Sequence, residues 1–178
     1  LGDVYKRQIW IRLVARGRAG HGSRLHDDNA VTKLAEAVAA LGRTRWPLRL
    51  TPTTEALLQG LSALTGRSID DPDALAAAAG PAEAFLRSSF RTTTNPTALT
   101  AGYKHNVIPE RAEALIDVRV IPGTEDEVLA ELQQIVGDDI EIQTVVRDIG
   151  METPFEGELV EAMAVSYTHL RAHETRGN

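Results

Sequence analysis

Residues 111–120 alternate between two kinds of side chain, and this period of two constrains the fold more than any other feature of the chain. The apolar set is Ala112, Ala114, Ile116, Val118 and Val120, and the set between them is Glu113, Leu115, Asp117 and Arg119. Such alternation indicates a β-strand with one buried face. Residues 9–15 and 140–146 alternate in the same way, and residues 97–102 suit a short strand. These strands predict a sheet that is covered on one face.

Two further segments have the period of an amphipathic helix. The first begins after Asp27-Asp28-Asn29, whose side-chain oxygens can cap a helix, and Gly42 is its predicted end. Its apolar stripe is Val31, Leu34, Ala35, Val38 and Leu41. The second begins after Pro122-Gly123, where Thr124 and Glu127 predict a capping box, and it ends at Gly137. Its stripe is Val128, Leu129, Leu132, Ile135 and Val136.

The order strand, helix, strand, strand, helix, strand predicts an α+β fold of the split βαβ (ferredoxin-like) type. This is a two-layer sandwich in which a four-stranded antiparallel sheet carries two helices on one face. Residues 43–90 do not fit that plan, because they contain helix-like pieces at 53–64, 72–79 and 81–88 that Gly and Pro interrupt. We therefore predict a helical insertion between the first helix and the second strand.

The composition excludes several classes of protein. Of the 178 residues, 43% are hydrophobic and 25% are charged, which is typical of a folded globular chain. The formal net charge of −6 argues against nucleic acid or an anionic membrane surface as a partner. No apolar run is long enough to span a membrane. Cysteine is absent, which fits a reducing compartment, and we expect a cytoplasmic location.

Three side chains are candidates for a site that binds an anion or a carbonyl oxygen. His21, in Gly20-His21-Gly22, can donate a hydrogen bond to an oxyanion, or can be an ordinary polar residue of a loop. Asn106 precedes Val-Ile-Pro, so its backbone is restricted and its amide can donate to a carboxylate or satisfy its own turn. Arg119 can bind a substrate carboxylate, or it can pair with Asp117 or with a cross-strand partner.

Outside residues 165–178, where His169 and His173 are four apart, no set of residues has the spacing of a metal site. His26 and Asp27 are adjacent, so a structural or capping role is the better interpretation for them. One His-x-Asp is present, His26-Asp27-Asp28, but it leads into the acidic helix start, and there is no paired Glu-Glu that could complete a site for two metal ions and a general base. The sequence therefore predicts no metal ligand in this chain.

Considered together, the motifs are more specific than any of these residues alone. They are Gly20-His21-Gly22-Ser23, the run from Thr94 to Leu99, Gly102-x-x-x-Asn106-Val107-Ile108-Pro109, and Asp117-x-Arg119 before Pro122-Gly123. In this order they resemble the lid, or dimerisation, domain of the aminoacylase, carboxypeptidase G and succinyl-diaminopimelate desuccinylase family of zinc metallohydrolases. On this resemblance the lid domain covers residues 9–150, and residues 151–164 begin the return to a catalytic domain.

The resemblance implies a role for each candidate residue. His21 looks like the lid histidine that crosses a dimer interface and stabilises the intermediate in the partner's active site. Asn106 and Arg119 look like the lid residues that hold the carboxylate end of the substrate. The implied partners are a second copy, which forms a homodimer through the lid, and a small amide or peptide substrate. The implied cofactor is zinc or cobalt, held in a catalytic domain outside this sequence.

The two ends of the chain do not continue the pattern beside them. Residues 1–8 and 165–178 resemble translated sequencing-adapter read-through, and we expect both to be foreign to the domain. The leading hypothesis is a lid-domain fragment of a metal-dependent hydrolase, inactive by itself. The alternative is a stand-alone module of the same fold that binds a small molecule or serves only for oligomerisation.

Overall fold

The computed structural model describes residues 7–148. The predicted foreign end at 165–178 and the return segment at 151–164 lie outside these residues, as do residues 1–6 of the other predicted foreign end. The elements in chain order are β1 Arg7–Arg16, β2 Gly20–His21, α1 Ala30–Arg43, α2 Pro52–Thr65, α3 Pro72–Ala78, the short 3-10 helix η1 Gly80–Ala82, α4 Glu83–Ser89, β3 Thr93–Ala101, β4 Val107–Ile108, β5 Arg111–Val120, α5 Glu125–Val136 and β6 Ile140–Arg147.

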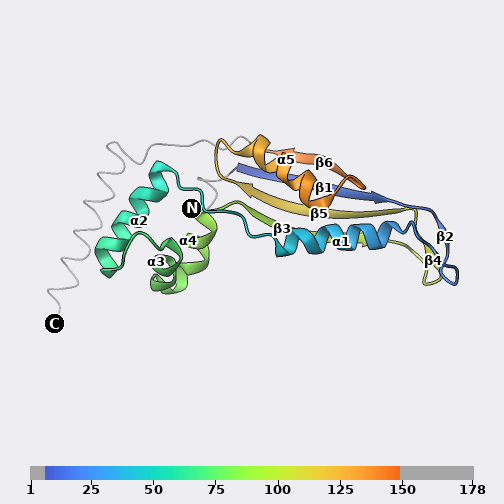
Figure 1. Cartoon of the computed structure of the whole chain (residues 1–178), viewed down its shortest axis with the longest axis horizontal. Helices are drawn as coiled ribbons and strands as arrows, with labels where there is room; N and C mark the ends of the chain where they lie inside the picture. The colour runs from blue at the N-terminus through green and yellow to red at the C-terminus, as the bar shows by residue number, and fades with distance from the viewer. Residues whose placement is uncertain (1–6, 149–178) are drawn as a thin grey trace.

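The predicted sheet is present, with strand order β3-β5-β1-β6 and antiparallel pairing throughout. Helices α1 and α5 lie against the same face of it, with α1 over the β3–β5 side and α5 beside β6 (Figure 1). This arrangement confirms the split βαβ fold. Strand β3 begins at Thr93, four residues before the predicted start at 97, because residues 93–96 pair with β5 even though they include Pro96.

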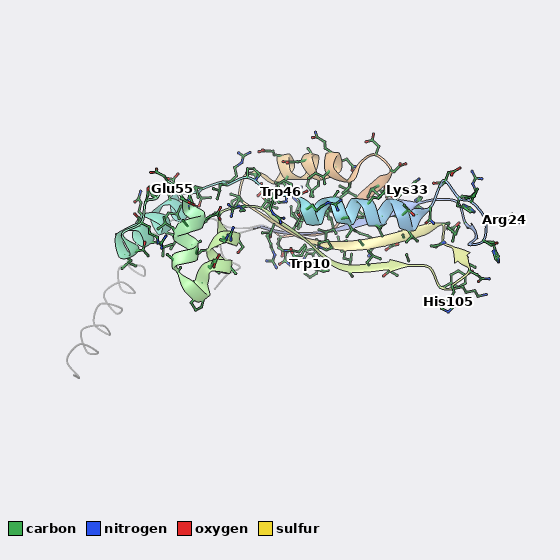
Figure 2. The ribbon with its side chains drawn as sticks, turned by 60° about the horizontal axis from the view of Figure 1, so that its bottom comes forward. Trp10, Arg24, Lys33, Trp46, Glu55 and His105 are labelled. Atoms are coloured by element: carbon green, nitrogen blue, oxygen red, sulfur yellow. The ribbon has the colours of Figure 1, made fainter. Side chains whose placement is uncertain are left out.

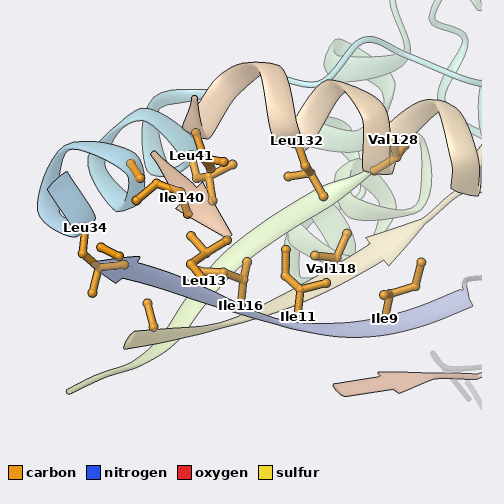
Figure 3. Packing of buried hydrophobic residues seen from close by; sticks show 14 of the residues in the cluster. Ile9, Ile11, Leu13, Leu34, Leu41, Ile116, Val118, Val128, Leu132 and Ile140 are labelled. Carbon is orange, nitrogen blue, oxygen red and sulfur yellow. The ribbon is translucent and has the colours of Figure 1, made fainter. Parts of the chain in front are cut away.

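The main core lies between the sheet and its two helices. Alternate residues of β1 and β5 enter it, as the period of two predicted, and α1 and α5 supply the other layer (Figure 3). Ile11, Leu13 and Leu132 are completely buried. Trp10, which neighbours Ile11 in β1, projects from the opposite face of the sheet and is partly exposed (Figure 2).

The buried face of α1 differs from the predicted stripe. Asn29 caps the helix as expected, by accepting hydrogen bonds from the backbone N–H groups of Val31 and Thr32. The buried residues are Ala30, Leu34, Ala37 and Leu41, whereas Val31 and Ala35 are exposed. The helix is rotated so that small alanines, which allow close approach, face the sheet. It continues one residue past Gly42 and ends at Arg43.

The predicted capping box of α5 is wrong. The Thr124 hydroxyl donates to the carbonyl oxygen of Ile121 instead of accepting from the helix, and no side chain caps this end. Glu127 is engaged elsewhere, because it forms an ion pair with Arg49 from the segment after α1. A local turn contact of Thr124 and a long-range ion pair of Glu127 have therefore taken the place of the capping box.

The helical insertion is present as α2, α3 and α4, which form a separate bundle at one end of the sheet (Figure 1). It has a small core of its own, made by Leu58, Leu75, Ala76, Leu86 and Phe90. The side chain of Trp46 stays in the main core, and its indole N–H donates to the Thr94 hydroxyl at 3.1 Å. Between residues 7 and 148 no helix is long and apolar enough to cross a membrane.

Candidate functional site

Two segments extend beyond the sheet at the end opposite the helical bundle, and we call residues 17–28 and 102–110 together the arm. The arm joins β1 to α1 and β3 to β5, and the two-residue strands β2 and β4 pair within it (Figure 1). Arg24 and His105 mark its tip, far from Trp46 (Figure 2). His21 and Asn106 both belong to the arm, so the structure brings these two predicted site residues together.

The root of the arm is tightly held. Gly17 N–H donates to the carbonyl oxygen of Glu110, and Arg18 N–H donates to that of Asp28, each at 3.0 Å. A Cβ at position 17 would lie 2.6 Å from the backbone nitrogen of Ala30, so only glycine fits where the chain leaves the sheet beside the start of α1.

Lys33, in the first turns of α1, stabilises the same root by hydrogen bonds. Its ammonium donates to Asp28 Oδ1 at 2.7 Å and to the carbonyl oxygen of Arg16 at 3.3 Å. The hydrogen bond between the two side chains raises the pKa of Lys33 and lowers the pKa of Asp28. The sequence gives little sign of this role for Lys33, because a cation one turn beyond an acidic helix start is its only local signal.

The His21 ring lies between two polar side chains. Its Nδ1 is 2.8 Å from the Ser23 hydroxyl, and its Nε2 is 3.4 Å from the side-chain nitrogen of Asn106. The backbone N–H of Ser23 donates to the same Nδ1 at 3.3 Å, so Nδ1 is an acceptor there, and the Ser23 hydroxyl can donate to it as well. The backbone supports this arrangement, because Gly22 N–H donates to the carbonyl oxygen of Asn106 at 2.9 Å.

Arg119 lies at the other end of the sheet. It is eight residues beyond Arg111, where β5 leaves the arm, and at about 3.3 Å per residue this is roughly 26 Å. Its Nε donates to Asp117 Oδ1 at 3.0 Å, and both side chains are partly buried. The pair with Asp117 that the sequence left open is therefore formed, and within one chain Arg119 does not join His21 and Asn106.

The chemistry of the arm suits an anionic or carbonyl group. Its cations are Arg18, Arg24 and Lys104, and it also holds three histidines. Its carboxylates, Asp27, Asp28 and Glu110, stand at the ends of the two segments, and Asp28 is already paired with Lys33. His21 and Asn106 are exposed, so both can turn their polar atoms to a ligand. Among residues 7–148 no three His, Asp or Glu side chains are grouped so as to hold a metal ion.

The sequence matches the family described as Peptidase dimerisation domain over residues 6–142. Among curated proteins it is 28% identical over 151 residues to Probable carboxypeptidase S-like 2 of Dictyostelium discoideum, a match that covers 78% of this chain and 28% of that protein. It is 27% identical over 125 residues to Aminoacylase-1 of Pongo abelii, covering 70% of this chain and 24% of that protein. The chain thus spans about a quarter of the length of these relatives.

Solved structures share the fold. A metallo-carboxypeptidase of Sulfolobus solfataricus superposes with a TM-score of 0.56 at 21% identity, covering 89% of this chain and 41% of that one. A tripeptidase of Staphylococcus aureus gives a TM-score of 0.56 at 12% identity, covering 93% of this chain and 35% of that one. At these identities the likeness concerns the fold alone.

Proposed function

The chain belongs to the peptidase dimerisation domain family, and on that premise we propose that it is the lid of a metal-dependent hydrolase that cleaves an amide bond in an N-acyl amino acid or a small peptide. The names of its relatives, an aminoacylase and a carboxypeptidase, support this class of substrate. In this proposal zinc or cobalt and the water-activating carboxylate belong to a catalytic domain. The bound metal would supply an activated water, whereas the lid would supply His21, Asn106 and Arg119.

One observation carries the proposal: the candidate residues lie at opposite ends of one sheet. His21 and Asn106 are on the arm, and Arg119 is roughly 26 Å away along β5. A single copy cannot close these residues around a small substrate. Two copies related by a two-fold axis can bring these residues together, if the arm of one copy lies beside the Arg119 end of the other.

Strand β3 is the edge on which two copies would pair. Its run Asn95-Pro-Thr-Ala-Leu-Thr-Ala101 is uncharged, and residues 95–100 are exposed. Natural edge strands are usually protected from pairing by charges, and the other edge, β6, carries Glu141 and Arg147. The uncharged edge is therefore the better candidate for an interface.

Antiparallel pairing of β3 with its copy gives the required geometry. Thr93, at the start of β3, is the register partner of Arg119, and Ala101, at the end of β3, leads into the arm. In an antiparallel pair the end of one β3 lies beside the start of the other. Arg119 of one copy would then be two strand spacings, about 10 Å, from the β3 that leads into the other copy's arm.

Subunit complementation tests the proposal. The complete gene would be recovered and its product assayed on N-acetyl amino acids and dipeptides with zinc or cobalt. One variant carries His21→Ala, and a second carries Glu→Gln at the general base of the catalytic domain. Each variant should be inactive alone, and an equal mixture should recover about one quarter of wild-type activity, because half of the dimers then hold one complete site.

The outcomes are distinct. A mixture that stays inactive after subunit exchange would show that His21 acts within its own copy, and a His21→Ala variant that is active by itself would show that His21 has no role in catalysis. The 178-residue chain should itself show no turnover with either metal, and metal-dependent turnover by it that His21→Ala abolishes would refute the assignment as a lid.

A further inference from the structure

The strands that carry the site are too short to hold themselves in place. β2 and β4 contribute two residues each, with Gly20 opposite Ile108 and His21 opposite Val107. An isolated two-stranded ribbon is marginally stable in water even when it is longer than this. The position of His21 beside Asn106 must therefore depend on additional contacts within the arm.

One such contact is made by His26. A Cβ built on Gly20 would lie 2.0 Å from His26 Nε2 and 2.6 Å from His26 Cε1. The imidazole therefore occupies the space in which a side chain at position 20 would stand. Gly20 is not among the glycines with a positive φ, so its backbone conformation does not require glycine. A side chain at position 20 would therefore require the His26 ring to move off the strand.

We infer that His26 is a positioning residue, which holds the His21–Asn106 pair by packing its ring against Gly20. The chain turns back after His21, where Arg24 N–H donates to the His21 carbonyl oxygen, and this turn brings residue 26 onto the strand it has just left. The ring covers Gly20 where this residue pairs with Ile108, so it limits the access of water to the β2–β4 pair. Its consequence for catalysis rests on the proposed function, but the packing does not.

Amide hydrogen exchange in this chain tests the inference. The reporter is Gly22 N–H, which donates to the Asn106 carbonyl oxygen, and Leu13 N–H in the central strand reports on the whole fold. In His26→Ala, exchange at Gly22 should accelerate roughly tenfold while Leu13 is unchanged, because only the arm opens. His26→Phe, which keeps a flat ring, should restore the slow exchange.

The dependence of Gly20 on His26 is tested by a double-mutant cycle. Gly20→Ala should also accelerate exchange at Gly22 about tenfold, but should add less than about twofold in the His26→Ala background, because the clash is then gone. The side-chain ¹⁵N shifts of His21 should move in each single variant, as its contact with Asn106 loosens.

Two variants serve as matched controls. His105→Ala removes an exposed histidine from the other segment of the arm, and Gly60→Ala adds a methyl group in α2 where nothing lies within 4 Å. Neither should change Gly22 exchange. Equal effects of Gly20→Ala with and without His26, or unaltered exchange in His26→Ala, would overturn the inference. No substrate is used, so this result is independent of whether the hydrolase proposal holds.

Discussion

The edge strand β3 offers the sharpest test of self-association, through Leu99→Lys. Leu99 is 56% exposed, and the residues beside it in β3 are uncharged. Burying a whole leucine side chain contributes about 1.5–3 kcal/mol, so burying the exposed half contributes about 1 kcal/mol. A two-fold interface contains this residue twice, which gives about 2 kcal/mol per dimer.

The expected effect follows from that free energy. A loss of about 2 kcal/mol raises the dissociation constant of the dimer about 30-fold, and the ammonium of the new lysine adds repulsion across the axis. Sedimentation velocity over a concentration series would measure the constant. Val145→Lys is the matched control, because Val145 is 46% exposed on the opposite edge strand, β6, and its replacement should leave the constant within about threefold.

Three results would refute this reasoning. The first is a wild-type chain that stays monomeric at every concentration. The second is a Leu99→Lys variant with an unchanged constant. The third is dissociation caused by Val145→Lys, which would move the interface to β6. At concentrations low enough for both variants to be monomeric, their thermal unfolding midpoints should be similar, since each side chain is largely outside the core.

Three further outcomes are expected from unfolding in urea. Trp46→Phe should lose about 1–2 kcal/mol at pH 7, because the Thr94 hydroxyl loses its buried indole donor. Leu132→Ala should lose about 2–5 kcal/mol, because it opens a cavity in the main core. Asp73→Asn should destabilise the chain at pH 7 but not well below pH 4. The hydrogen bond from Arg91 lowers the pKa of Asp73, so its contribution is present above the ordinary pKa of an aspartate and is lost as the pH falls through the lowered one.

The sheet and its two covering helices were predictable because each is recorded in local periodicity. A strand with one buried face must alternate, and residues 111–120 do so without interruption. The buried face of α1 was harder to predict from the sequence. Alanine is compatible with either environment, so the sequence could not distinguish Ala37 from Ala35, and contact with the sheet decided between them.

The candidate site was predictable as a set of residues but not as an arrangement. His21 and Asn106 are 85 positions apart, and their contact depends on the arm that β2 and β4 form. The packing of His26 on Gly20 had no signal in the sequence, because it arises where a loop folds back over its own strand.

By itself, the sequence determined the strands, the two amphipathic helices, the helical insertion and the residue types available for binding, because propensity and period act over a few neighbouring positions. Only the tertiary structure decided that Arg119 lies at the opposite end of the sheet from His21 and Asn106. That separation arises because the β2–β4 pairing holds His21 beside Asn106 beyond the start of β5, whereas Arg119 lies near the end of β5. This geometry is the reason that the proposed site needs a second copy.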